Sequence, residues 1–305
     1  MNPRTATSLS IALVAAVAFF GCSKGTVEAP TPKPRTRVIL LGTGNPNADP
    51  ERHGPATAIT VDDAVYLVDF GPGVVRRAAA AGLPMEKLSR AFATHLHHDH
   101  TSGYADLIFT PWTLERTEPL EVYGPPGIAK MTEHLLAAYS EDVALRLDGL
   151  EPANKAGYKV NAHEIAPGVI YKDDNVTVKA FAVPHGSWKY AFGYRFETTD
   201  RIIVISGDTT ASPAVEENAR GADVLLHEVI CGAGLAKRTP DWKAYHTAFH
   251  TTAPDLGHIA ARAKPKLLLL HHVLLSGCTE DQLLKEIYDA GFTGRTVIGK
   301  DLEVF

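Results

Sequence analysis

A histidine-rich turn at residues 94–100 restricts the chemistry and the fold of this 305-residue chain more than any other segment. The pattern H-x-H-x-D-H spans His95–His100 and directly follows a predicted strand at Arg90–Thr94. In such a loop, alternate residues can point at one metal ion while the next Asp-His pair points at another. Imidazole and carboxylate groups together favour zinc, although iron and manganese accept the same ligands. The segment therefore predicts a metal site at the end of a strand.

Three further segments place a candidate ligand just after an apolar strand. His185 follows residues 181–183, Asp208 follows residues 202–205, and His271 follows residues 267–270. A single histidine after a strand is more often structural than a ligand. Three such residues beside turns favour a common site, because α/β scaffolds build their sites from the loops at strand ends.

Short apolar strands alternate with helical segments along the chain after residue 36. One helix is predicted at Ala253–Ala263, where Thr252 and Asp255 form a start similar to a capping box. This alternation predicts a layered α/β fold. Hydrophobic residues make up 45% of the chain and charged residues 21%, which excludes disordered and fibrous classes.

The N-terminus is predicted to be an export signal. Arg4 provides the positive end, residues 9–20 form an apolar core, and small residues lie before Cys22. Gly21-Cys22-Ser23 is similar to the lipobox of bacterial lipoproteins, so residues 1–21 are interpreted as a lipoprotein-type signal peptide and Cys22 as the lipidation site. Residues 22–36 are interpreted as a flexible tether. We therefore expect a periplasmic protein anchored to the membrane through Cys22; cleavage after Ala18, without lipid, is the alternative.

Net charge and cysteine content limit which binding partners and which cellular compartment are expected. The formal net charge is −5, and it becomes −6 without residues 1–21, whose only charged side chain is Arg4. Proteins that hold nucleic acid stably usually carry a basic surplus, so no stable nucleic-acid partner is expected. If Cys22 is acylated, Cys231 and Cys278 remain. In an oxidising periplasm they could pair, or they could stay buried thiols, and the sequence leaves both open.

The order of the motifs resembles the metallo-β-lactamase superfamily, and more closely its branch with ribonuclease Z and the zinc-dependent arylsulfatases. The resemblance covers residues 37–305. It rests on these segments: Leu41-Gly42-Thr43-Gly44, Asp69, the H-x-H-x-D-H turn, His185 before Phe192-Gly193-Tyr194-Arg195, Ser206-Gly207-Asp208-Thr209, His227-Glu228, His250-Thr251-Thr252-Ala253 and His271. The family implies one hydrolase domain, a four-layer αββα sandwich with the metals at one edge. It also makes a homodimer possible.

The resemblance also implies a role for each motif residue. One zinc ion would be held by His95, His97 and His185, and a second by Asp99, His100 and His271, with Asp208 bridging the two. A hydroxide between two metals about 3.5–4 Å apart would be the nucleophile, so Asp99 serves catalysis as well as binding. Asp69 would orient the ligands rather than bind metal.

His250 lies just before the predicted helix at 253–263. The resemblance implies that it contacts the substrate anion and protonates the leaving group, supported by Glu228, with His227 nearby. The alternative is that His250 and Glu228 form only a buried hydrogen-bonded pair. The remaining neighbours of motif residues are expected to be exposed or to support the ligands: His98, His246 and His272.

The substrate is predicted to be a small anionic ester, either a phosphodiester or an aryl sulfate. Ribonuclease Z grips transfer RNA with an arm between the motifs of His185 and Asp208, and here only 22 residues separate the two. The aromatic residues Tyr104, Trp112 and Trp188 could form a wall for an aryl or nucleobase group, or belong to the core. The alternatives are a cyclic-nucleotide phosphodiesterase, a β-lactamase-like hydrolase, and a lipoprotein that binds zinc without turnover.

Overall fold

Two mixed β-sheets form the centre of residues 35–305, the part of the chain that the computed structural model describes. The predicted signal peptide 1–21, the lipidation site Cys22 and the tether up to residue 34 lie outside the described residues. The first sheet has the strand order β1-β2-β3-β4-β5-β6. Its strands are β1 (Thr36–Gly42), β2 (Ala56–Val61), β3 (Ala64–Val68), β4 (Arg90–Phe92), β5 (Leu120–Gly124) and β6 (Val160–Glu164).

The second sheet has seven strands, in the order β13-β12-β11-β10-β9-β8-β7. Its strands are β7 (Gly168–Lys172), β8 (Val176–Ala182), β9 (Phe192–Thr198), β10 (Ile202–Ile205), β11 (Val224–Ile230), β12 (Leu267–Leu274) and β13 (Arg295–Ile298). Strands β10 to β13 run parallel, whereas β7 to β10 are antiparallel neighbours. The sheet therefore collects the ends of β10, β11 and β12 at one edge.

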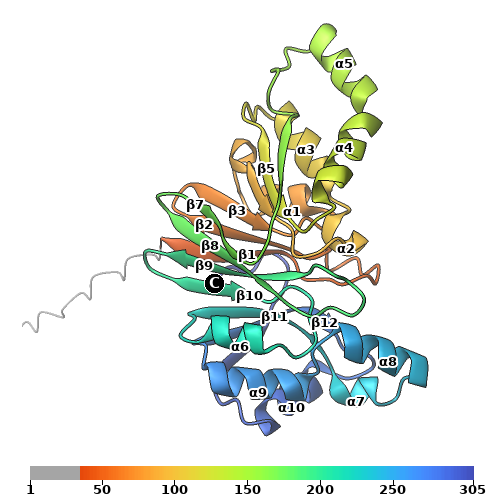
Figure 1. Cartoon of the computed structure of the whole chain (residues 1–305), viewed down its shortest axis with the longest axis vertical. Coiled ribbons are helices and arrows are strands. Elements are labelled where there is room, and N and C mark those ends of the chain that lie inside the picture. Colours follow the sequence, from red (N-terminus) through yellow and green to blue (C-terminus); the bar gives the residue numbers. More distant parts are fainter. Residues whose placement is uncertain (1–34) are drawn as a thin grey trace, which may run out of the picture. The chain divides into compact units, whose positions relative to one another are not determined.

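Helices cover the outer faces of the two sheets (Figure 1). Those of the first half are α1 (Val74–Ala80), α2 (His98–Thr101), α3 (Tyr104–Thr113), α4 (Ile128–Ala138) and α5 (Ser140–Asp148), with a 3₁₀ turn at Met85–Lys87. Those of the second half are α6 (Pro213–Ala219), α7 (Gly232–Leu235), α8 (Pro240–Phe249), α9 (Ala253–Ala263) and α10 (Glu280–Asp289). None of the helices within residues 35–305 is both long and apolar enough to cross a bilayer.

Three apolar cores join these layers. Strand β1 contributes to two of these cores, because its side chains alternate between the two faces of the sheet. Ile39 and Leu41 pack toward the helices of the first half, whereas Val38 and Leu40 pack between the sheets. A third core lies between the second sheet and α6, α9 and α10. The predicted four-layer αββα sandwich is thus confirmed. Tyr104 and Trp112, 1% and 2% exposed, belong to the first core and form no substrate wall.

The predicted start of α9 is present: the Thr252 hydroxyl accepts a hydrogen bond from the Asp255 backbone N–H, at 3.3 Å. The Asp255 carboxylate also lies in this first turn, 2.6 Å from the Thr252 hydroxyl. A carboxylate there already complements the helix dipole, so the start of α9 does not favour a substrate anion.

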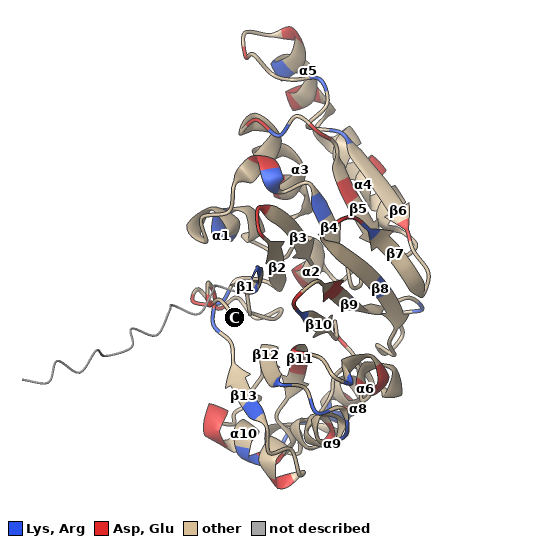
Figure 2. Ribbon diagram, turned by 90° about the vertical axis from the view of Figure 1, so that its left-hand side faces the viewer, with Lys and Arg blue, Asp and Glu red and all other residues tan. Residues whose placement is uncertain are grey.

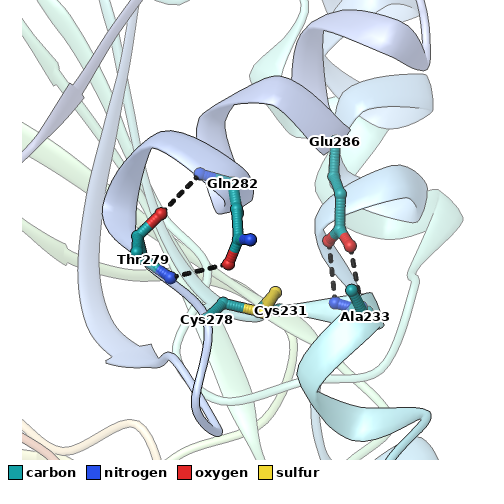
Figure 3. The surroundings of a disulfide bond; sticks show 7 residues. Cys231, Ala233, Cys278, Thr279, Gln282 and Glu286 are labelled. Atoms are coloured by element: carbon teal, nitrogen blue, oxygen red, sulfur yellow. Dashed lines mark hydrogen bonds between the residues drawn. A yellow bond between two sulfur atoms is a disulfide. The ribbon is translucent and has the colours of Figure 1, made fainter.

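Cys231 and Cys278 form a disulfide bond. Of the two alternatives that the sequence left open, pairing is therefore the one found. The bond joins the end of β11 to the segment before α10 (Figure 3). On the same side, Glu286 of α10 accepts hydrogen bonds from the backbone N–H groups of Gly232 and Ala233, at 2.8 and 2.7 Å. The strand that carries His227 and Glu228 is therefore tied to α10 beside the site.

Removing this disulfide should destabilise the protein. The two cysteines are 47 residues apart in sequence, and closing a loop of that length removes entropy from the unfolded chain worth about 4 kcal/mol. We expect the Cys231→Ser, Cys278→Ser double variant to lose about that much free energy of unfolding in denaturant titrations. The oxidised wild type and the wild type kept in reductant are the controls. Equal stability of all three proteins would contradict a disulfide in the native state.

Candidate metal centre

The predicted ligand segments meet at one edge of the sandwich. His95 and His97 follow β4, and Asp99 and His100 lie in α2. His185 follows β8 and Asp208 follows β10. His95, His97, His185 and Asp208 lie just after the end of a strand, as the sequence predicted. Asp99 and His100 instead lie in a short helix, where the sequence predicted a turn. Together with His250 and His272, all these residues form three clusters through their side-chain nitrogen and oxygen atoms, and the third shares one residue with each of the other two.

The first cluster contains His95, His97, His185 and Asp208, whose ligand atoms all lie within 4.8 Å of one another. His97 Nδ1 is 2.9 Å from His95 Nε2 and 3.2 Å from His185 Nε2. Ligand atoms of a tetrahedral zinc site with bonds of 2.0–2.1 Å lie about 3.3 Å apart. The three imidazole nitrogens are therefore spaced as ligands of one ion.

The protonation of these histidines also fits a metal. Burial lowers the pKa of His95 well below its ordinary value, and it lowers the pKa values of His97 and His185 to about 4. All three rings are thus neutral at neutral pH and offer a lone pair, as metal binding requires. His185 Nδ1 donates to the Phe249 carbonyl oxygen at 2.8 Å, which leaves Nε2 free as the ligand.

Trp188 contacts the same cluster. Its indole N–H donates to His97 Nε2 at 2.7 Å. A metal bound to His97 Nδ1 would leave the proton of the neutral ring on Nε2, so this hydrogen bond and metal binding exclude each other. Of the three aromatic residues proposed as a substrate wall, Trp188 alone lies at the metal site.

The second cluster contains Asp99, His100 and His272. The His272 Nε2 atom lies 3.3 Å from Asp99 Oδ2 and 3.4 Å from Asp208 Oδ2. His100 Nε2 lies 3.6 Å from Asp99 Oδ2 and 3.5 Å from Asp208 Oδ1. This His100 atom is buried and has no hydrogen-bond partner among the described residues. A metal ion bound to His100 Nε2 would give this atom the partner it lacks, so the donor set fits a second ion.

Asp69 hydrogen-bonds to His100 of the second cluster but is not itself a member of that cluster. It accepts hydrogen bonds from the backbone N–H and hydroxyl of Thr94, at 2.7 and 2.9 Å, and from His100 Nδ1 at 2.8 Å. Burial alone would lower the pKa of His100, but the carboxylates of Asp208 and Asp69 raise it well above its ordinary value. Asp69 therefore fixes the ring so that Nε2 points at Asp99 and Asp208.

The sequence assigned His271 to the second metal, but the structure brings His272, not His271, into the second cluster. Strand β12 pairs regularly with β11 up to Leu270, and pairing resumes at Val273. Between them, two residues of β12 oppose the single residue Glu228, which is a β-bulge. His272 adopts φ 47°, and its ring reaches Asp99 and Asp208. His271 is buried, and neither of its ring nitrogens has a hydrogen-bond partner among residues 35–305.

His250 forms the third cluster with Asp208 and His272, and Glu228 lies next to it. His250 Nδ1 is 3.2 Å from Glu228 Oε2 and 4.0 Å from Asp208 Oδ2. The other Glu228 oxygen accepts the Thr251 backbone N–H at 2.7 Å. Burial lowers the pKa of His250, but the carboxylates of Glu228 and Asp208 raise it, and the pKa lies above its ordinary value. The pair is thus suited to hold a proton at the site.

His227 was expected to lie near His250 and Glu228 and to support the site, but its ring makes no hydrogen bond to the residues of the three clusters. It is buried and contacts the Glu228 carbonyl oxygen through Nδ1, at 2.5 Å, and its Nε2 has no partner among the described residues. Because side chains alternate along a strand, His227 and Glu228 point to opposite faces of β11. Only Glu228 faces His250.

A cavity of about 530 Å³ opens beside His250, and sequence reasoning missed most of its lining. Trp242, Tyr245 and His246 of α8 form one wall, and Arg52 and Arg238 lie at its border. The only available signal was the spacing of rings in the segment 242–249, which a buried helix would also show.

Comparison with known proteins identifies the family. The model of the Beta-lactamase superfamily domain matches residues 65–273. A ribonuclease Z from Mycobacterium marinum is 33% identical over 272 residues, which cover 87% of this chain and 96% of that protein. A ribonuclease Z from Mycobacterium sp. strain KMS is 35% identical over 240 residues, 78% of this chain and 84% of that protein.

Solved structures agree on the fold. The metallo-beta-lactamase fold protein YhfI from Bacillus subtilis superposes with a TM-score of 0.70 at 20% identity, covering 88% of this chain and 98% of that one. The short form of human tRNase Z superposes with a TM-score of 0.67 at 22% identity, with the same coverage. The chain therefore belongs to the metallo-β-lactamase superfamily, in its ribonuclease Z branch, and is a metal-dependent hydrolase acting on ester bonds.

Proposed function

We propose that this protein is an exported hydrolase of small phosphodiesters that works with two zinc ions. The observation that carries the proposal is the place of Asp208, whose carboxylate belongs to the first cluster and also contacts His100 and His272 of the second. When bound, two zinc ions would polarise the ester and make water a nucleophile at neutral pH. The histidine-rich donor set favours zinc, and Mn²⁺ or Fe²⁺ would fit the same ligands.

His250 supplies the proton that the reaction needs. As the water oxygen bonds to phosphorus and the ester P–O bond breaks, the leaving oxygen takes a proton from the His250 ring. Glu228, 3.2 Å from His250 Nδ1, stabilises the imidazolium before that transfer. The products are a phosphate monoester and an alcohol, and the ring regains its proton from solvent through the adjoining cavity.

The surroundings of the site support a small substrate. Between His185 and Asp208 the chain forms only a tight turn and the two strands β9 and β10, so it leaves no room for a long arm. Basic and acidic residues are interspersed along the ribbon (Figure 2). Arg262 of α9, for example, pairs with Glu216, and Lys285 pairs with Asp289 on α10. A net charge of −5 gives the protein little attraction for a polyanion.

Hydrolysis of RNA is the second candidate. Its support is the name of the relatives, ribonuclease Z, which are 33–35% identical over most of this chain. Aryl sulfates are a third substrate class that the same anion-binding chemistry could serve. The three classes differ in size and in the atom attacked, so a substrate panel separates them.

Export is proposed on two observations. The first is the sequence of residues 1–22, with its apolar segment before Cys22. The second is the Cys231–Cys278 disulfide, because such bonds persist in oxidising compartments and are rare in the cytosol of most bacteria. We propose that Cys22 carries lipid and holds the protein at the periplasmic side of a membrane.

The deciding experiment is a substrate panel on zinc-loaded protein. It compares bis(p-nitrophenyl) phosphate, p-nitrophenyl sulfate, nitrocefin and a precursor transfer RNA. We expect hydrolysis of the phosphodiester, metal-dependent and lost in chelator. Preferred cleavage of the RNA would replace the small-substrate proposal with RNA processing, and binding of zinc without any turnover would leave a zinc-binding lipoprotein. In cells, Cys22→Ala should move the protein from the membrane fraction to the soluble periplasm; an unchanged fraction would contradict lipid attachment.

A further inference from the structure

Helix α8 presents a row of rings on one face. Trp242, Tyr245, His246 and Phe249 follow the spacing i, i+3, i+4, i+7, which brings side chains to the same side of a helix. Tyr245 and Phe249 stack at 4.4 Å between ring centroids, and Trp242 and His246 stack at 5.4 Å. The Trp242 ring also meets Tyr245 edge to face at 5.7 Å. The rings therefore form one continuous aromatic surface.

This surface begins at the metal ligands. The Phe249 ring lies 4.9 Å from the His185 ring and 6.2 Å from the His97 ring, measured between centroids. The backbone fixes this end of α8, because the Gly186 N–H donates to the Ala248 carbonyl at 2.9 Å and His185 Nδ1 donates to the Phe249 carbonyl. The aromatic surface thus runs from the metal centre into the cavity beside His250.

The far end of the surface is exposed. Trp242 is 49% exposed and Tyr245 is 40% exposed, and both line the cavity. Large rings are costly to leave in water and are enriched where a partner or ligand covers them. Here they lie next to a site that His250 and the metal ligands already define.

A planar cation lies next to the rings. The Arg238 guanidinium lies 5.5 Å from the centre of the Trp242 ring, and no carboxylate within residues 35–305 pairs with it. Arg52 pairs with Glu280 at 3.3 Å, which offsets that acidic group. The carboxylate of Asp49 accepts the Glu51 backbone N–H at 3.0 Å. Asp49 and Arg238 thus both line the cavity without a partner of opposite charge among residues 35–305, and the planar group of Arg238 can stack on a ring.

From this arrangement we infer that the aromatic face of α8 binds a planar ring of the substrate, an aryl or nucleobase group, on the leaving-group side of the ester. The inference rests on the proposed function for the position of the ester, since His250 marks the leaving side. The ring would stack on Trp242 and Tyr245 while its phosphate lies at the metal centre. Arg238, beside Trp242, would place its planar guanidinium against the same ligand ring.

Calorimetric titration tests this inference without turnover. The ligands are adenosine 5′-monophosphate, phenyl phosphate and ribose 5-phosphate, which share a phosphate and differ in the ring. They are added to the full chain, both zinc-loaded and treated with chelator. We expect the two ligands with a planar ring to bind roughly tenfold more tightly than ribose 5-phosphate, the usual scale for one stacked ring. Tighter binding of the nucleotide than of phenyl phosphate would indicate a nucleobase, and equal binding a simple aryl group.

Matched variants locate the preference. Trp242→Ala and Tyr245→Ala should each reduce the advantage of the ring ligands, whereas Trp242→Phe should keep most of it. Tyr288→Ala is the control, because Tyr288 is also a helical tyrosine, 43% exposed, but lies on α10 outside the cavity. Equal affinity for all three ligands in the wild type, or a preference that survives Trp242→Ala and Tyr245→Ala together, would overturn the inference. A ring preference without hydrolysis of any ester would leave it standing and refute the proposed function.

Discussion

Replacing His272 with alanine is expected to empty the second metal site and to lower ester hydrolysis by roughly 10³-fold. The His272 Nε2 atom lies 3.3 Å from Asp99 and 3.4 Å from Asp208, so its loss removes one of the groups that enclose that site. A metal ion contributes several kcal/mol of charge stabilisation, and each 1.36 kcal/mol corresponds to a tenfold change in rate. The first cluster does not include His272, so its metal should remain.

The neighbouring His271→Ala variant is the matched control. It removes the same chemical group one residue away, but His271 belongs to none of the three clusters. Metal analysis after gel filtration should give about one equivalent for His272→Ala and about two for His271→Ala and the wild type. Thermal unfolding of both variants shows whether either loses its fold. Loss of metal in His271→Ala, with retention in His272→Ala, would restore the assignment made from the sequence.

His250→Ala should keep its metal and lose about 10²–10⁴-fold in turnover, the usual effect of losing one general acid. The loss should depend on the leaving group. A p-nitrophenolate leaves readily without a proton, so activated esters should suffer least and alkyl or ribose esters most. Kinetics on an ester series with leaving alcohols of increasing pKa, together with metal analysis, measures both effects.

Glu228→Gln provides the graded control for this second prediction. It keeps the shape of the side chain but removes the negative charge 3.2 Å from His250 Nδ1, so it should show a smaller loss with the same trend across esters. An equal loss for every ester would mean that His250 binds the anion without acting as the acid. Metal loss in His250→Ala would make it a ligand, a role its distance of 4.0 Å from Asp208 leaves geometrically open.

The sequence predicts those parts of the site that follow strictly from strand periodicity. His95, His97, His185 and Asp208 each come just after an apolar strand that ends at the same edge of the sandwich, and they meet there. The layered α/β fold was predictable because strands and helices alternate along the chain, and the resemblance to the family implied the four layers.

Other parts of the site depend on local events that composition and spacing do not reveal. The bulge in β12 shifts the pairing register by one residue. A shift of one residue exchanges the faces of a strand, so the sequence does not show whether His271 or His272 faces the metal site. The pairing of Cys231 with Cys278 depends on a Cα–Cα distance of 6.5 Å that only the packed helices create. The ring spacing of α8 is equally typical of a helix that packs its rings into the core. Only the exposure of Trp242 and Tyr245 shows that these rings face a cavity.

The junction between Gly186 and Phe249 sets how this enzyme can diversify. A side chain at position 186 would begin 2.1 Å from the Phe249 ring, and the backbone there has φ 52°, so that end of α8 and the ligand His185 must change together or not at all. Trp242, seven residues and two helical turns away, is under no such constraint. Substitutions at Trp242 should therefore change which rings are bound without moving the ligand His185.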